Sequence, residues 1–263
     1  MTLAIASSQA VRRRCDPRSS SPLPERDYAA LEYIGRWYQV AQYQLDDAVF
    51  SQRSPTVASR CVRRMVAAGY IAVERWNRIG VNLIRLTSRG RSALVDRGVA
   101  TSTLFVPEKP VALKDLAHHL WIVDAGLMLL RLDSSLELTP CWALRRRLAA
   151  LRPAAIPDVL AIRVGGDRVP EGVLAVEVDL GGERLKNVLV PKLGVLQETL
   201  AGWCSGQPAA IVVLTVGTRR IAALTAAVQS LPQTIPVVVY SLPRQSGRPG
   251  LAELRKTLGE ALT

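Results

Sequence analysis

Residues 54–87 read SPTVASRCVRRMVAAGYIAVERWNRIGVNLIRLT, and this stretch decides the fold of the first half of the chain. Ser54 followed by Pro55 is a strong helix start, because serine caps the first turn and proline fits the first helical position. The helix is expected to end at Gly69. The β-rich runs that follow, YIAVER and VNLIRLT, flank a turn that contains glycine, which predicts a β-hairpin.

The predicted helix has two different faces. Ala58, Val62 and Met65 lie at i, i+4 and i+7 and are expected in the core. The opposite face is polar and basic. A helix of this kind fits the DNA major groove, where arginine binds guanine O6 and N7 in bidentate fashion. The side chains expected to contact DNA, from this helix and from the hairpin, are Arg53, Thr56, Ser59, Arg60, Arg63, Arg64, Arg75, Arg78 and Arg85.

Further helices are expected around this stretch, over residues 27–40 and 42–50 before it and residues 86–96 after it. Helix, helix, basic helix, hairpin, helix is the order of a winged helix-turn-helix. The pattern R-x-V-x-x-M-x-x-x-G-Y-I, from Arg60 to Ile71, and the following L-T-x-x-G resemble that superfamily closely. The resemblance implies DNA binding. The alternative is a winged helix that docks a protein partner and leaves its arginines solvated.

Charge is unevenly distributed along the 263 residues. The chain has 34 Lys+Arg and 22 Asp+Glu, a net charge of +12, and residues 1–110 alone carry a net charge of +8. A basic surplus points to a polyanionic partner, although an arginine-rich codon bias is an alternative explanation. Hydrophobic residues make up 49%, which excludes a largely disordered chain.

Composition also limits location and chemistry. The four cysteines show no metal-ligand spacing, so a zinc site or a disulfide framework is not expected. No apolar run is long enough to span a bilayer, and the N-terminus lacks the features of a secretory signal, so the expected location is the cytoplasm, away from membranes.

The expected domains are a mobile basic arm over 1–25, the winged helix-turn-helix over 26–97, a linker over 98–112 and an α/β domain over 113–263.

The second half alternates helix-like and strand-like stretches, which is typical of an α/β domain with a mixed sheet. Expected helices cover 113–132, 183–200, 219–231 and 251–262. Expected strands cover 136–142, 156–163, 172–180, 209–216 and 235–240.

Three acidic residues in this half occupy positions that a core does not require. Asp158 follows a proline at the start of one strand, and Glu177 and Asp179 lie two apart on the next strand, so both point to one face. If the strands are hairpin neighbours, the three carboxylates converge. Such a group requires a cation, and Mg²⁺ is bound in proteins by one or two carboxylates plus waters and phosphate oxygens.

The P-D pair followed about twenty residues later by a carboxylate in a valine-rich strand resembles the PD-(D/E)xK nuclease-like fold. The lysine of that motif polarises the attacking water. In this chain Asp179 occupies the position of the lysine in E-x-K. Lys192 or Lys186 from the following helix can take the place of that missing lysine. The resemblance implies Asp158, Glu177, Asp179 and Lys192 as candidate catalytic residues, with the three acids as metal ligands.

Residues 27–200 resemble the replication-relaxation family of plasmid and mobile-element proteins, most specifically in AVEVDLGGERLKNVLVPKLGVL. Glu177, Asp179, Glu183 and Lys192 match that family's pattern, whereas Arg145 stands where an acidic residue is expected. The resemblance implies double-stranded DNA binding in replication, relaxation or mobilisation, with a degenerate nuclease-like domain. A homodimer and replication or mobilisation proteins are compatible partners. The alternative is a metal-dependent nicking endonuclease.

Overall fold

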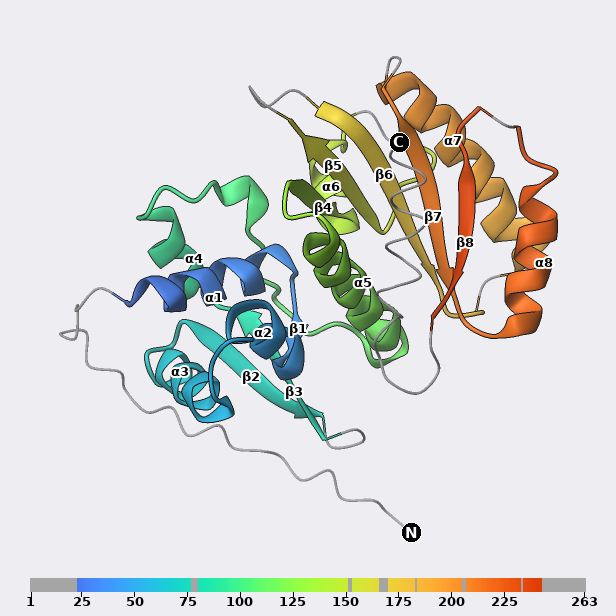
Figure 1. Ribbon diagram of the computed structural model, residues 1–263. Coiled ribbons are helices and arrows are strands. Elements are labelled where there is room, and N and C mark those ends of the chain that lie inside the picture. Colours follow the sequence, from blue (N-terminus) through green and yellow to red (C-terminus); the bar gives the residue numbers. More distant parts are fainter. Residues whose placement is uncertain are drawn as a thin grey trace, which may run out of the picture.

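The computed structural model describes residues 23–76, 80–150, 153–165, 170–182, 184–204, 207–232 and 234–242 (Figure 1). The fold is α+β, with a small three-stranded sheet in the first half and a mixed five-stranded sheet in the second half. Most of the expected basic arm and the expected helix over 251–262 lie outside the described residues.

The first half is built from four helices around the small sheet. Its strands are antiparallel and lie in the order β1-β3-β2. The elements are α1 (Glu25–Arg36), β1 (Val40–Ala41), α2 (Gln42–Val49), α3 (Pro55–Ala67), β2 (Ile71–Trp76), β3 (Val81–Leu86) and α4 (Ser88–Val95).

Local sequence explains where these helices begin and end. Pro55 occupies the first turn of α3, and Gly69, with φ +75°, follows the end of the helix in the left-handed conformation that glycine adopts without strain. The Thr87 side chain accepts a hydrogen bond from the Gly90 backbone N–H at 3.1 Å and so caps α4. The expected helix over 27–40 ends early, at Arg36, because Tyr38 has a positive φ of 66° and turns the chain into β1.

The second half begins with a 3₁₀ turn and a long helix. Its sheet has the order β4-β5-β6-β7-β8, antiparallel from β4 to β6 and parallel from β6 to β8. The elements are η1 (Thr101–Thr103), α5 (Leu113–Leu132), β4 (Leu136–Pro140), α6 (Cys141–Arg147), β5 (Val159–Val164), β6 (Pro170–Asp179), the π-helical turn η3 (Leu185–Leu189), α7 (Val190–Cys204), β7 (Ala209–Thr215), α8 (Thr218–Val228) and β8 (Val237–Ser241).

Helices cover both faces of this sheet. Residues of α5 pack with Leu174 and Val176 of β6, whereas Leu193 and Leu196 of α7 pack with Ala175 on the opposite face. Figure 1 shows α5 on one side of the strands and α7 and α8 on the other. The strand that the sequence predicts over 136–142 ends at Pro140, and helix α6 begins at Cys141.

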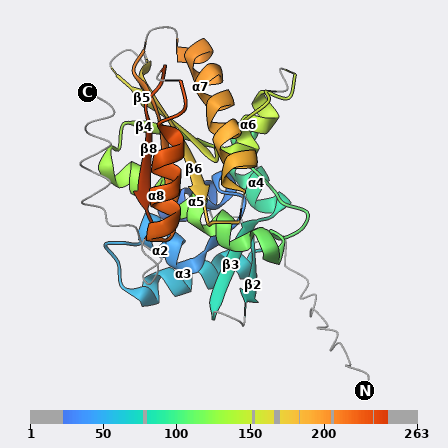
Figure 2. The same cartoon turned by 90° about the vertical axis from the view of Figure 1, so that its right-hand side faces the viewer.

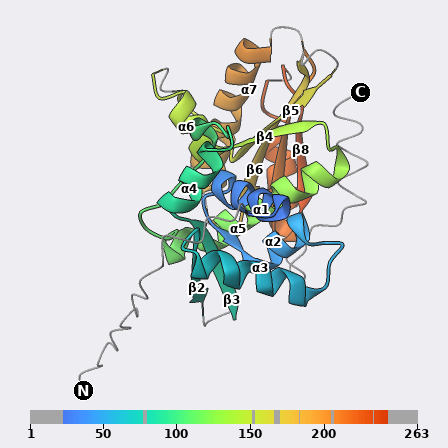
Figure 3. The ribbon, with the colours of Figure 1, turned by 90° about the vertical axis from the view of Figure 1, so that its left-hand side faces the viewer.

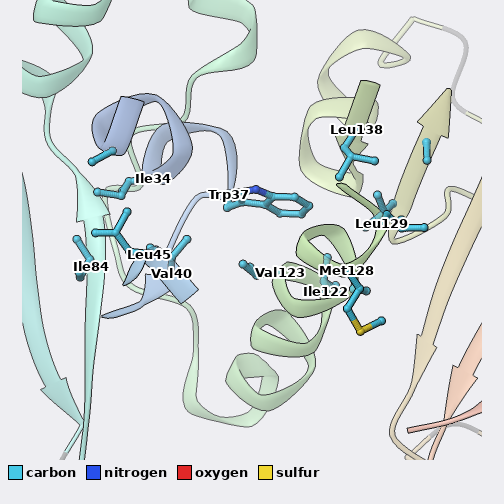
Figure 4. Packing of buried hydrophobic residues seen from close by; sticks show 14 of the residues in the cluster. Ile34, Trp37, Val40, Leu45, Ile84, Ile122, Val123, Met128, Leu129 and Leu138 are labelled. Atoms are coloured by element: carbon cyan, nitrogen blue, oxygen red, sulfur yellow. The ribbon is translucent and has the colours of Figure 1, made fainter. Parts of the chain in front are cut away.

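The two halves share one hydrophobic core. Trp37, which follows α1, is fully buried and lies between Leu45 on one side and Val123 of α5 on the other (Figure 4). A Cβ atom on Gly126 of α5 would lie 2.1 Å from the Trp37 ring, so only glycine fits there. Residues 98–112, expected as a linker, contribute the buried Leu104 to the same core.

Candidate functional site

Helix α3 presents the basic face that its sequence predicts. Ala58, Cys61, Val62 and Met65 are buried against the rest of the protein. On the other side Thr56, Arg60 and Arg63 are exposed, Ser59 is partly exposed, and Arg53 is exposed just before the helix. The Arg63 side chain lies back along the helix, with Nε 3.4 Å from the Ser59 carbonyl oxygen. The solvent-facing side of α3 is therefore polar and positively charged.

Arg64 differs from its neighbours on α3 because it has an ionic partner within the fold. Its guanidinium forms an ion pair with the carboxylate of Asp27, which is completely buried in α1. The Cys61 thiol also donates to Asp27, at 3.1 Å. A buried carboxylate without a cation is costly, so Arg64 stabilises the α1–α3 contact through Asp27, which also has Arg26 nearby at 3.7 Å. The Arg64 side chain is still 46% exposed, and its contact with DNA stays a prediction.

The hairpin arginines lie on different faces of the small sheet. Arg75 is exposed and shares the face of Ile71, which packs in the core beside α3. Arg85 pairs in register with Ala72 and therefore points to the other face, where Nη1 lies 3.5 Å from the Glu108 carbonyl oxygen. Only Arg75 is thus available on the α3 side, and Arg78 lies outside the described residues.

The three candidate carboxylates lie at one end of β5 and β6, and each has a basic side chain of its own as a partner. Glu177 is 2% exposed, and one of its carboxylate oxygens accepts a hydrogen bond from the Lys192 Nζ at 2.6 Å. The sequence prediction that a lysine of the following helix is directed at this group is confirmed for Lys192. Lys186 is exposed on η3, and Glu183 lies outside the described residues.

Asp179 is held by α8. The Arg220 guanidinium donates to both of its carboxylate oxygens, at 2.8 and 3.1 Å, and the Thr215 hydroxyl donates at 2.8 Å. Burial alone would raise the pKa of Asp179, but the bonds from Arg220 and Thr215 outweigh burial and lower it. Sequence reasoning missed Arg220. The feature that could have identified Arg220 is the parallel pairing of β6 with β7. This pairing brings the start of α8 beside the end of β6.

Asp158 lies directly before β5, beside the end of β6. It accepts a hydrogen bond from the Val178 backbone N–H at 2.9 Å, and the His118 Nε2 lies 3.2 Å from the same carboxylate oxygen. Burial lowers the pKa of His118, but the hydrogen bond and the charge of Asp158 outweigh burial and raise it. His118 of α5 is therefore a partner of a candidate site residue.

The candidate magnesium ligands are paired with basic side chains in this arrangement. Asp179 and Glu177 already use carboxylate oxygens to accept from Arg220 and Lys192, so the acids do not present a shared set of open ligands. Among the described residues, no group of three or more His, Cys, Asp or Glu side chains is placed to hold a metal ion.

The Cys141 thiol lies near these acids. Burial first and then the charge of Asp158 raise its pKa to about 12, so the thiol is protonated at neutral pH.

His119 gives this region a pH-dependent stability. It is buried between the two halves, with Nε2 2.6 Å from the Gln39 carbonyl oxygen, and burial lowers its pKa from 6.5 to about 4. Because the unfolded chain binds this proton more tightly, the free energy of unfolding should fall by about 3 kcal/mol as the pH drops from 6.5 to 4.

Urea unfolding across that pH range measures the effect. The variant His119→Gln keeps a donor for Gln39 and should lose most of the slope. His118→Gln is the matched control and should keep it, since the folded-state pKa of His118 is raised and its contribution is complete below pH 6.5. Equal slopes for wild type and His119→Gln would contradict this assignment.

Comparisons of this chain with protein families, with curated proteins and with solved structures give no match. Within the described ranges, no helix has both the length and the apolar composition needed to cross a membrane.

Proposed function

We propose that this protein binds double-stranded DNA, with α3 in the major groove and the β2–β3 hairpin beside it. The observation that carries the proposal is the division of α3 into a buried apolar face and an exposed face with Thr56, Arg60 and Arg63. Arg53 and Arg75 extend the positive charge at the start of the helix and on the hairpin. Arginine on an exposed helix face is suited both to guanine edges and to phosphates.

The arrangement of the first half supports a winged helix-turn-helix. Helices α1, α2 and α3 are followed by a hairpin whose strand β3 also pairs with the short β1, and α4 packs after it. In such an arrangement the third helix is free to enter a groove because the other helices and the sheet bury its apolar side. A role in plasmid or mobile-element replication, relaxation or mobilisation is the context that the sequence resemblance proposes.

We do not extend the proposal to strand cleavage. The carboxylates that a metal-dependent nuclease would need are held in separate ion pairs with Lys192, Arg220 and His118. We infer that this part of the second half has a structural role, as in a degenerate nuclease-like domain.

The test is duplex binding by the full chain in a fluorescence-anisotropy titration. Arg60→Ala/Arg63→Ala should weaken binding by about tenfold or more, since each arginine on DNA is worth about 1–3 kcal/mol. Wild-type affinity should also fall steeply between about 50 and 200 mM salt. Arg219→Ala, an exposed arginine on α8, is the control with the same type of charge removed.

Two results would reject the proposal. One is the absence of a duplex complex at low salt, and the other is unchanged affinity in Arg60→Ala/Arg63→Ala. Association with a protein partner that is insensitive to salt, without DNA binding, would instead support the adaptor alternative.

A further inference from the structure

Helix α6 ends in three consecutive arginines with different surroundings. Arg146 has a structural role, because its guanidinium lies 4.1 Å from the centre of the Phe105 ring and its Nη1 lies 3.4 Å from the Leu104 carbonyl oxygen. Arg145 and Arg147 are exposed. Within the part of the chain that the structure describes, neither forms an ion pair.

The position of α6 relates these arginines to the proposed DNA-binding elements. Figure 2 shows α6, α4 and the β2–β3 hairpin following one another down one side of the molecule, and Figure 3 shows the same side from the opposite direction. Arg91 of α4 is exposed, whereas Arg89 lies over the Tyr70 ring and Arg97 pairs with Glu25.

The charge of this surface is not explained by the fold. The C-terminal end of a helix stabilises nearby cations, but its dipole is equivalent to only about half an elementary charge. Asp158 and Glu177 lie near the start of α6, where they act on the Cys141 thiol together with Arg145, but they are paired with His118 and Lys192. Glu137 lines the same hollow of about 290 Å³ as Arg147. Exposed like charges on adjacent residues repel one another, and an anionic ligand removes that repulsion.

We propose that Arg145 and Arg147 form a second DNA-binding surface, which contacts phosphates of the same duplex beyond the segment held by α3. The inference rests on the proposed function. These side chains contact the sugar-phosphate backbone and so add affinity without sequence preference. Helix α4, which lies between α6 and the β2–β3 hairpin in Figure 2, carries the exposed Arg91 and adds positive charge. The duplex required for full affinity is therefore longer than α3 and the hairpin alone would cover.

Two duplexes of different length test the proposal, one of about 12 and one of about 36 base pairs, roughly one and three helical turns. In Arg145→Gln/Arg147→Gln, affinity for the long duplex should fall by about five- to tenfold. The slope of log affinity against log salt should fall by about two, since each phosphate contact contributes about 0.9. Affinity for the short duplex should not change. Arg146 is left intact because it packs on Phe105.

Arg184→Gln/Arg219→Gln is the charge-matched control, as both arginines are exposed elsewhere in the second half. It should bind both duplexes as the wild type does. The inference is overturned if Arg145→Gln/Arg147→Gln behaves like this control, or loses affinity equally for both lengths. If the proposed function itself is wrong, the result is different: Arg60→Ala/Arg63→Ala then binds the short duplex as tightly as the wild type does.

Discussion

Trp37→Ala is expected to lower the free energy of unfolding by about 3–5 kcal/mol, the range for removing a fully buried tryptophan side chain. Trp37 is 0% exposed and lies against Gly126 of α5, while its ring is 6.2 Å from that of Trp142 at an interplanar angle of 74°. No neighbouring side chain fills this space, since glycine faces the ring. The variant should leave a large cavity between the two halves.

Urea unfolding followed by far-ultraviolet circular dichroism measures the change. Trp37→Phe retains most of the apolar volume and should cost clearly less than Trp37→Ala. The exposed Trp203 of α7 provides a control, and Trp203→Ala should change stability by less than about 1 kcal/mol. A cost of Trp37→Ala no larger than that of the control would mean that this ring is not the central contact between the halves.

Lys192→Met is expected to destabilise the protein by about 3–5 kcal/mol, because it removes the cation from the buried carboxylate of Glu177. Glu177 is 2% exposed on a central strand, and the Lys192 Nζ lies 2.6 Å from its carboxylate. Adding Glu177→Gln should restore a large part of the loss, since the double variant no longer buries an unpaired charge. Lys186→Met, an exposed lysine on the preceding turn, should change stability by about 0.5 kcal/mol or less.

Thermal and urea unfolding of the wild type, Lys192→Met, Glu177→Gln and the double variant completes a double-mutant cycle. A coupling energy near zero between Lys192 and Glu177 would show that their contact contributes little. A coupling of the expected size would assign Lys192 to stability and leave catalysis as an unsupported role for it.

Much of the fold followed from local patterns. The Ser54-Pro55 start, the apolar spacing of Ala58, Val62 and Met65, and the hairpin after Gly69 each arise from nearby residues, and these elements were predicted within a few residues. The same holds for the valine-rich strand that carries Glu177, whose continuous apolar character reflects burial on both faces.

The sequence could not show contacts between distant residues. Arg64 looks like its neighbours in sequence, and only the packing of α1 on α3 places it on Asp27. The partner of Asp179, Arg220, is 41 residues away in the chain, so the pair has no local signal. The early end of α1 depends on the positive φ of Tyr38, which no helix signal in the sequence marks. Single side-chain partners of this kind require a tertiary structure.

The contact between Trp37 and Gly126 has a consequence for how such a chain can be recombined. A DNA-binding cassette that is exchanged between proteins needs a boundary that can be cut without exposing its interior. Here a cut anywhere between residues 98 and 112 would leave a fully buried tryptophan on one fragment and the apolar groove around Gly126 on the other. Separated at this segment, the two halves should therefore not fold as independent fragments, and they should be inherited as one unit.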